Sequence, residues 1–321
     1  MPRTGQEMTG SGNAAAEAAR LDVLLNPLFG DEYELVEARR VRRFGGELVV
    51  LDAPYRSDYL RYLCSVGRDG ATVSQQSAMS LLHPAKLVFH YERLMASSFA
   101  LVPSTPAAPL PRSALLLGLG GGAMLRYVAS HLPSCRVTVV EREAAIVHLA
   151  RRHFHVRSPV VVADARKFVA DAVAAPGERY DVILVDLYDA GGAVTADADF
   201  WTGCLALLAP GGCLAANWAD FADSDRYRPA AELLGAQISG TFYATPRGFN
   251  DNLVQFCPTD PGATLAVLPD RLAAFEDRLR LRRRAWRMLE RDVLSTIFPE
   301  PPPNRAADRR RRRQRLSDHG G

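Results

Sequence analysis

The sequence lacks a long hydrophobic run, a close pair of cysteines and a cluster of histidines. No apolar stretch approaches the 18 residues that suggest a membrane-spanning helix. Residues 1–20 lack the apolar centre of a signal peptide. The five cysteines are scattered without a C-x-x-C pair, which favours reduced thiols in a cytoplasmic protein over disulfides or a zinc site. We therefore expect no membrane association and no metal centre.

The chain also has little net charge, and its basicity is confined to the C-terminal end. Residues 271–321 hold 15 Arg against 7 Asp and Glu, a net of +8 compared with +3 for the whole chain, so residues 1–270 carry −5. An acidic body is compatible with a cationic substrate. Arg309 to Arg313 could bind phosphate, but no aromatic residues are interleaved with them, which favours a solvated tail over a nucleic-acid site.

Turn signals and apolar runs divide the chain into a small lobe and a larger domain. Short β-like runs fill residues 33–76 and predict an antiparallel sheet. Helical spacing from Leu81 to Leu101 predicts a helix that a Pro-rich linker ends. The expected divisions are a disordered N-terminus at 1–20, a β-lobe at 21–80, a helix and linker at 81–111, a Rossmann-like nucleoside-binding domain at 112–260, a C-terminal helix at 261–298 and a disordered Arg-rich tail at 299–321.

The larger domain opens with an apolar run that ends in a glycine cluster. Ala114 to Gly118 is followed by further glycines, a helical stretch and a second apolar run that ends at Glu141. This pattern is typical of a βαβ unit that holds a nucleotide-like ligand against a helix N-terminus, with the acid free to bind both ribose hydroxyls. The alternative is a buried strand followed by an ordinary glycine turn.

Acidic residues follow the next strand-like runs at a regular interval. Counted from Gly118, the steps to Glu141, Asp164 and Asp186 are 23, 23 and 22 residues. One strand and one crossover helix fit each step, which predicts an α/β fold with a mostly parallel sheet and helices on both faces. Because such strands end at one edge, the three carboxylates should lie together beside the glycine loop.

The acid after the third strand indicates which nucleoside is bound. Asp164 and Ala165 would offer a carboxylate and a backbone N–H to an adenine edge. An acid on the ribose together with Asp-Ala at the adenine is the arrangement of proteins that bind adenosyl sulfonium compounds. It favours S-adenosylmethionine or its decarboxylated form, as a co-substrate, over NAD.

Over roughly residues 33–257 the chain resembles the spermidine synthase (polyamine aminopropyltransferase) family. Shared features follow in the same order, from an N-terminal β-lobe through a glycine-rich loop to a Y-D-V-I-x-V-D-x-x-D motif. The residues that carry the resemblance are Gln76, Tyr91, the glycine loop from Gly118, Val140-Glu141, Asp164-Ala165 and Tyr180 to Asp189.

The resemblance implies a Rossmann-like fold of the class I methyltransferase type, with a donor site and an acceptor site. In the donor site Glu141 would bind the ribose and Asp164 with Ala165 the adenine. The loop glycines that would cradle the donor are Gly118, Gly120 and Gly122. In the acceptor site Asp186 would orient and deprotonate the attacking amine, because a protonated amine is no nucleophile. The acceptor-binding residues implied by position are Asp189 as a counter-ion, Tyr91 and Gln76.

The chain departs from the family at both ends of the implied site. Gly121 replaces an Asp that the family uses near the aminopropyl group of the donor. Leu187 and Tyr188 replace a Ser pair, and Arg247 stands on a loop where the family has a Tyr. A cation there would repel a polyamine. Plainer roles also stay open, with Asp189 as a helix N-cap and Tyr91 as a core residue.

Three functions are compatible with these residues. The first is aminopropyl transfer from decarboxylated S-adenosylmethionine to a diamine such as putrescine. The second is methyl transfer from intact S-adenosylmethionine, which the loss of the loop Asp allows. The third is a non-catalytic adenosyl-binding protein. The expected partners are a small amine and, by resemblance, a second copy of the chain.

Overall fold

The computed structural model describes residues 10–41, 46–67, 69–106, 108–175, 177–189, 192–193, 197–219, 227–245, 252–279 and 297–299. The chain forms two compact units, Met1–Leu82 and His83–Gly321. Within the described ranges, no helix is both long enough and apolar enough to span a bilayer.

The first unit is an antiparallel sheet with one helix. Its strands follow in chain order across the sheet. They are β1 (Glu34–Val41), β2 (Gly46–Tyr55), β3 (Asp58–Val66) and β4 (Val73–Ser80). Helix α1 (Gly10–Phe29) buries Leu21 and Leu25, and the Phe29 ring centroid lies 4.9 Å from that of Tyr62. The predicted antiparallel sheet is confirmed.

The N-terminal segment differs from the expectation of disorder. Residues 1–9 lie outside the described ranges, but residues 10–20 form the first half of α1. Ala occupies five of the six positions from 14 to 19, and Ala has the highest helix propensity. The Gly and Ser content at the start of the segment hid this signal.

The second unit is built around a mixed sheet in the order β14-β12-β13-β11-β8-β5-β6-β7. The strands are β5 (Ser113–Leu117), β6 (Arg136–Glu141), β7 (Val161–Val162), β8 (Tyr180–Val185), β11 (Leu208–Ala219), β12 (Phe242–Ala244), β13 (Asn252–Pro258) and β14 (Ile297–Phe298). From β7 to β11 neighbouring strands pair in parallel, and from β11 to β14 they pair antiparallel. A separate ribbon joins β9 (Tyr188–Asp189) to β10 (Gly192–Ala193). The predicted mostly parallel sheet is confirmed.

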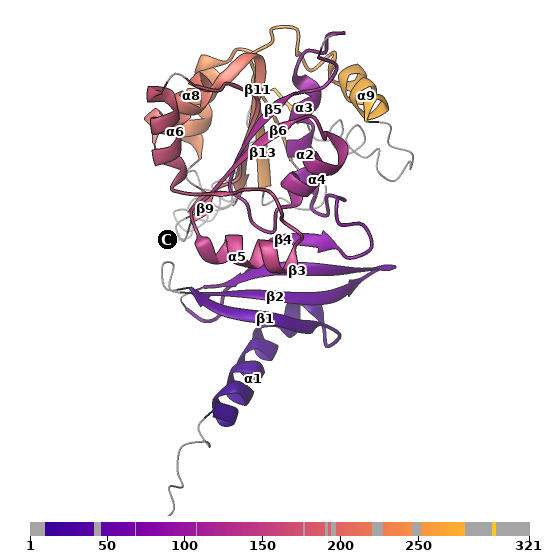
Figure 1. The fold of residues 1–321 in the computed structure, drawn as a ribbon, viewed down its shortest axis with the longest axis vertical. Coiled ribbons are helices and arrows are strands. Elements are labelled where there is room, and N and C mark those ends of the chain that lie inside the picture. Colours follow the sequence, from indigo (N-terminus) through magenta and orange to yellow (C-terminus); the bar gives the residue numbers. More distant parts are fainter. Residues whose placement is uncertain are drawn as a thin grey trace, which may run out of the picture. The chain divides into compact units, whose positions relative to one another are not determined.

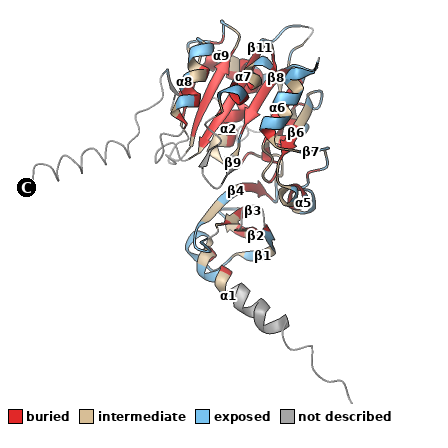
Figure 2. Ribbon diagram, turned by 90° about the vertical axis from the view of Figure 1, so that its left-hand side faces the viewer, coloured by how far each residue is buried: buried red, intermediate tan, exposed pale blue. Residues whose placement is uncertain are grey.

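Helices cover both faces of this sheet (Figure 1). They are α2 (His90–Ala96), α3 (Ser98–Leu101), α4 (Ala123–His131), α5 (Ala144–His153), α6 (Ala165–Ala174), α7 (Ala198–Ala206), α8 (Arg228–Gln237) and α9 (Leu268–Arg278). One core contains Leu94, Phe99 and Phe275 from α2, α3 and α9, and the other contains Trp201 and Leu234 from α7 and α8. Figure 2 shows the central strands buried between these two layers.

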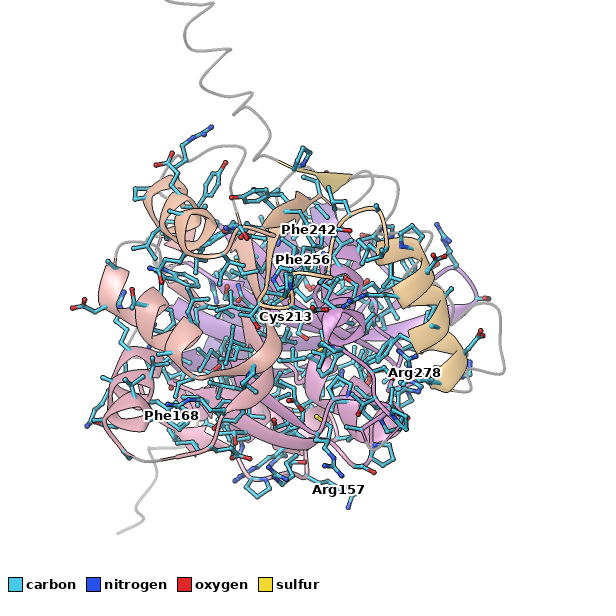
Figure 3. The ribbon with its side chains drawn as sticks, turned by 90° about the horizontal axis from the view of Figure 1, so that it is seen from above. Arg157, Phe168, Cys213, Phe242, Phe256 and Arg278 are labelled. Carbon is cyan, nitrogen blue, oxygen red and sulfur yellow. The ribbon has the colours of Figure 1, made fainter. Side chains whose placement is uncertain are left out.

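The central strands are apolar because both of their faces are covered. All five residues of β5 are buried, as expected for a parallel strand between two helix layers. Figure 3 labels Cys213, Phe242 and Phe256 in the interior, and the two phenylalanine rings stack with centroids 4.8 Å apart. These side chains fix the strands whose ends carry the candidate site.

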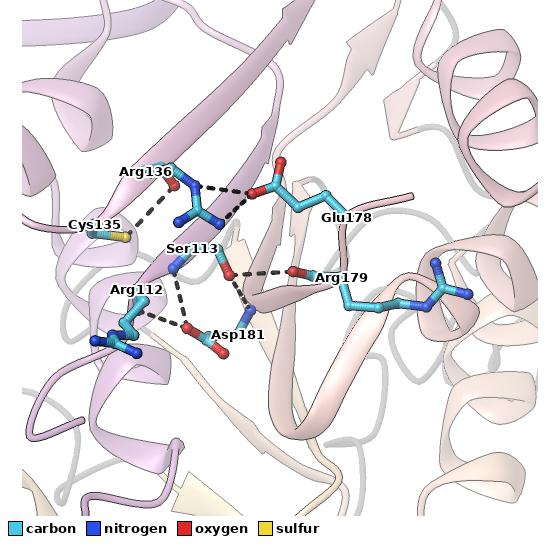
Figure 4. Close-up of polar contacts among 7 residues, drawn as sticks. All are labelled: Arg112, Ser113, Cys135, Arg136, Glu178, Arg179 and Asp181. Atoms are coloured by element: carbon cyan, nitrogen blue, oxygen red, sulfur yellow. Dashed lines mark hydrogen bonds and ion pairs between the residues drawn. The ribbon is translucent and has the colours of Figure 1, made fainter. Parts of the chain in front are cut away.

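A polar cluster closes the edge of the sheet where β5 and β8 begin (Figure 4). The Asp181 carboxylate accepts hydrogen bonds from the backbone N–H groups of Arg112 and Ser113, at 2.6 and 3.1 Å. Arg136 and Glu178 form an exposed ion pair at 2.7 Å. This edge lies at the opposite strand ends from the acids discussed below, so we regard it as structural.

Two expected helices have different bounds. The helix predicted from Leu81 to Leu101 is confined to α2 and α3, because Pro84 disfavours helical backbone before it and Phe89 is extended, with φ −78° and ψ 146°. The helix predicted over 261–298 is α9 alone among the described residues. Its expected last residues, Ile297 and Phe298, instead form β14 against β12.

Candidate active site

The glycine loop between β5 and α4 has a backbone that requires glycine. Gly118, Gly120 and Gly122 have φ values of +102°, +52° and +75°, which L side chains adopt only with strain. A Cβ on Gly118 would lie 2.2 Å from the carbonyl oxygen of Asp186. The loop is therefore pressed against the end of β8, and the predicted turn into a helix N-terminus is present.

Glu141 holds this loop to the end of β6. Its Oε2 accepts a hydrogen bond from the backbone N–H of Leu119 at 3.1 Å, and its Oε1 accepts one from that of Glu143 at 2.8 Å. The side chain is buried, and burial raises its pKa above the usual range of a glutamate. Each carboxylate oxygen has a second lone pair, so both can also accept a hydroxyl.

Asp164 lies after β7, next in order along the same edge, and also caps a helix. Its Oδ1 accepts hydrogen bonds from the backbone N–H groups of Arg166 and Lys167, at 2.9 and 3.4 Å, as the N-cap of α6. Both bonds go to one oxygen. The residue that begins the helix is Ala165, whose N–H belongs to the first turn that no helical carbonyl can satisfy. Capping and ligand binding are thus compatible at this position.

Asp186 lies directly after β8 and receives hydrogen bonds from two other elements. Its Oδ1 accepts one from Asn217 Nδ2 of β11 at 2.8 Å, and its carboxylate accepts one from the hydroxyl of Tyr91 on α2. The residue is exposed to solvent, yet protein atoms surround it closely enough that burial raises the pKa of the carboxylate, against the lowering effect of both bonds. Tyr91 also packs on the core, as its plainer interpretation predicted, and its role in acceptor binding stays a prediction.

Asn217 and Asn252 extend the polar edge onto β11 and β13, and sequence reasoning missed both. Asn252 Nδ2 donates to Asn217 Oδ1 at 3.0 Å. The two residues are neighbours because β11 and β13 pair antiparallel, with Ala219 opposite Asn252. The only signal in the sequence is an amide at the end of each apolar run.

Two buried charged residues from α2 and α4 lie behind the loop. Glu92 accepts a hydrogen bond from the backbone N–H of Phe89 at 3.0 Å, and burial raises its pKa to about 7. Arg126 donates to the carbonyl oxygens of Gly121 and Phe154, and burial lowers its pKa to about 10. Arg126 and Glu92 attract each other electrostatically. Through its hydrogen bond to the Gly121 carbonyl, Arg126 stabilises the glycine loop.

Two expected site residues and one loop are left untested by the described structure. Asp189 is placed only by its backbone, in β9 opposite Gly192, which excludes it as the N-cap of α7, a position that Asp197 fills. Gln76 belongs to the other unit, where its amide donates to Ser65 Oγ at 2.9 Å. The loop with Arg247 lies outside the described residues.

Curated relatives have sequences similar to that of this chain. No family model matches the sequence. The chain is 28% identical over 188 residues to a polyamine aminopropyltransferase of Neisseria meningitidis, and 30% identical over 187 residues to one of Chromobacterium violaceum. These similarities support the resemblance to the spermidine synthase family. Each alignment covers 56% of this chain and 66% of the relative, just under two thirds of the relative's length.

Solved structures share the fold. A probable spermidine synthase from Corynebacterium glutamicum is 19% identical, with a TM-score of 0.54 over 74% of this chain and 86% of that chain. Human methyltransferase-like protein 13 in complex with SAH is 22% identical, with a TM-score of 0.55 over 61% and 95%. A spermidine synthase in complex with the transition-state analogue AdoDATO is 16% identical, with a TM-score of 0.54 over 75% and 79%.

Proposed function

We propose that this protein transfers an aminopropyl group from decarboxylated S-adenosylmethionine to a diamine such as putrescine. The observation that carries the proposal is the Asp186 carboxylate, held by Tyr91 and Asn217 directly beside the glycine loop. Curated relatives that are named polyamine aminopropyltransferases support the same reaction.

The donor would lie across the ends of β5, β6 and β7. Its ribose hydroxyls would bind Glu141, and its adenine would lie at Asp164 and Ala165. Loop N–H groups and the N-terminus of α4 would face its polar groups. We propose no metal in this site.

The reaction needs a base beside the sulfonium. The neutral amine of the acceptor attacks the aminopropyl carbon that is bonded to the sulfur. The bond between this carbon and the sulfur breaks, and its electron pair stays on the sulfur, which becomes a neutral thioether. The proton that the amine loses goes to Asp186, which lies at the end of the neighbouring strand from the loop. A carboxylate suits this role because it also attracts the cationic acceptor. Asp189 would bind the far amine.

The direct test is product analysis with both donors. The protein incubated with putrescine and decarboxylated S-adenosylmethionine should form spermidine and methylthioadenosine in equal amounts. Asp186→Asn keeps the shape but loses the base, so the turnover rate should fall about 100- to 10,000-fold. Donor affinity, measured by calorimetry, should change far less. Wild-type turnover of the Asp186→Asn variant would show that this mechanism is wrong.

A second candidate is methyl transfer, and Gly121 favours it. This position has no side chain with which to neutralise the primary amine that decarboxylation leaves at the end of the donor. The fold is shared with a methyltransferase structure that contains SAH. Formation of S-adenosylhomocysteine from intact S-adenosylmethionine, with no methylthioadenosine from the decarboxylated donor, would establish this function instead. Binding of a donor without product would favour a non-catalytic role.

We further propose that the protein acts as a homodimer in the cytoplasm, as part of polyamine biosynthesis. The support for this proposal is the family resemblance. Sedimentation velocity at micromolar concentration tests the dimer, and polyamine levels in cells that lack the protein test the pathway.

A further inference from the structure

A chain of side-chain amides leads from the first residue of β13 to Asp186. Asn252 donates to Asn217 at 3.0 Å, and Asn217 donates to Asp186 at 2.8 Å. Asn217 is 6% exposed, so water does not readily replace either bond. The three residues come from β13, β11 and the end of β8, which are adjacent strands of one sheet.

The order of donors and acceptors in this chain fixes the orientation of the Asn217 amide. An amide offers an NH₂ group on one side and a carbonyl oxygen on the other. Asn252 occupies the carbonyl oxygen, so the NH₂ group must face Asp186. An NH₂ group can only donate, and an ionised carboxylate can only accept. This arrangement matches an ionised Asp186 and gives no acceptor to a proton on the same oxygen.

The protein atoms packed around Asp186 act in the opposite direction, even though the residue is exposed. Replacing part of the water around a carboxylate favours its protonated form. Among the described residues, Tyr91 and Glu92 of α2 are the titratable groups that interact with it, and Glu92 is in turn opposed by Arg126 of α4. Tyr91 stabilises the anion with a hydrogen bond, whereas Glu92 disfavours it when ionised. To stay ionised, the Asp186 carboxylate therefore needs a hydrogen-bond donor that does not itself titrate.

We propose that Asn217 is a positioning residue for Asp186, with Asn252 locking its amide so that the carboxylate stays ionised and directed at the acceptor amine. This role rests on the proposed function, since it assigns Asp186 as the base. Asn217 does not touch the reacting atoms. It fixes the plane of the carboxylate, whose oxygens keep further lone pairs for the proton of the amine.

The test compares Asn217→Leu, which keeps the size but removes the donor, with three further variants. Asn217→Asp puts a carboxylate of the same shape against Asp186. Asn252→Leu leaves Asn217 in place but frees its amide to rotate. Thr259→Val, which removes a hydrogen bond of 2.9 Å to the Gly212 carbonyl at the other edge of the sheet, is the matched control.

Two readouts separate positioning from stability. In Asn217→Leu the kcat for the amine should fall about 10- to 100-fold, the scale of a misplaced catalytic group, while its KM changes little. The carboxyl ¹³C resonance of Asp186, assigned by its absence in Asp186→Asn, should titrate at higher pH, as should the acid limb of kcat/KM. Asn252→Leu should shift the ¹³C titration and the acid limb in the same direction by a smaller amount, and Asn217→Asp by a larger amount. Thr259→Val should leave both pH dependences unchanged.

The outcomes distinguish this inference from the proposed function. A folded Asn217→Leu variant with unchanged Asp186 titration and unchanged kcat overturns the inference, even if the wild type transfers aminopropyl groups. If the wild type proves inactive with every amine, the proposed function fails, and the titration alone decides whether Asn217 keeps Asp186 ionised. Should Asn217→Leu not fold, the shifts in Asn217→Asp and Asn252→Leu decide in its place.

Discussion

At the scale of single residues, Gly118 links the donor loop to the proposed base. Its φ is +102°, and the carbonyl oxygen of Asp186 occupies the space that a Cβ would need. The backbone N–H of Asp186 also donates to the carbonyl of Leu117 at 2.9 Å. Loop and base are therefore held at a fixed separation by main-chain atoms, before any side chain is considered.

Gly118→Ala should lower the stability of the protein by more than the strain of its backbone angle alone. Gly30 has a φ of +70°, and a Cβ there would meet nothing within 4 Å beyond its own chain neighbours, so Gly30→Ala should cost only the backbone strain, about 1–2 kcal/mol. Gly118→Ala carries the same strain and also displaces the end of β8. Urea denaturation should show a loss of stability larger than for Gly30→Ala, together with loss of donor binding. Equal losses in the two variants would contradict the steric link.

Glu141 should contribute directly to donor affinity. Glu141→Ala removes the proposed acceptor of the ribose hydroxyls and should weaken binding of an adenosyl ligand by about 1.5–3 kcal/mol, the range of hydrogen bonds to charged groups. Isothermal calorimetry measures this change. Glu178→Ala breaks only the exposed ion pair with Arg136 at the opposite edge and should leave affinity unchanged. Wild-type affinity in a folded Glu141→Ala variant would remove Glu141 from the site.

At the scale of secondary-structure elements, α2 brings two ionisable groups, Tyr91 and Glu92, close to Asp186. Its N-terminus is capped by Glu92, which accepts the Phe89 N–H while buried among protein atoms. Burial raises the pKa of this carboxyl from 4.5 to about 7. The folded state therefore binds its proton more tightly than the unfolded state does, and stability is coupled to pH through this residue.

The coupling has a definite sign. The contribution of Glu92 to stability is fully present below its unfolded pKa of 4.5 and is lost as pH rises through its folded pKa of about 7. Relative to Glu92→Gln, which keeps an acceptor for Phe89 N–H, the wild type should lose on the order of 2–3 kcal/mol of unfolding free energy between pH 4.5 and pH 7.5. Urea titrations at several pH values measure the difference. Parallel curves for the two proteins would show that Glu92 is not buried as a neutral acid.

The elements also show what the sequence could predict. Parallel βα units have a regular length, so the interval from Gly118 to Asp186 was enough to place Glu141 and Asp164 at one edge. Antiparallel strands have no such rule for their partners. Asn217 and Asn252 become neighbours only through the register of β11 and β13, and an amide beside an apolar run is no signal by itself. The binding and catalytic roles of the predicted site residues, Asp189 and Gln76 included, remain predictions.

At the scale of the whole molecule, the chain consists of two compact units with separate hydrophobic cores. All three tryptophans of the sequence lie after residue 83. Trp201 and Trp218 are buried in the second unit, with ring centroids 4.9 Å apart. Tryptophan fluorescence therefore reports on the second unit, whereas far-ultraviolet circular dichroism reports on both.

Thermal unfolding should reflect this division. We expect the fluorescence transition to be single and the circular dichroism transition to contain a second phase from the first unit. An adenosyl ligand at 100 times its Kd should stabilise the fluorescence transition by about 2.7 kcal/mol. A ligand that shifts only the circular dichroism phase of the first unit would place the binding site outside the second unit.

The variant Leu25→Ala opens a cavity in the first unit. It should lower the melting temperature of the circular dichroism phase that belongs to this unit and leave the fluorescence transition unchanged.

The contact between Gly118 and Asp186 has a consequence for how this protein can evolve. Main-chain atoms fix the donor side, so substitutions there have almost no room to accumulate. On the other side of Asp186, the contact is made by the side-chain amide of Asn217, which Asn252 bonds in turn, so that side chains further out along these strand ends can be exchanged without moving the backbone. Under the proposed function, descendants of this chain should therefore diversify in the amine they accept while inheriting the sulfonium nucleoside unchanged.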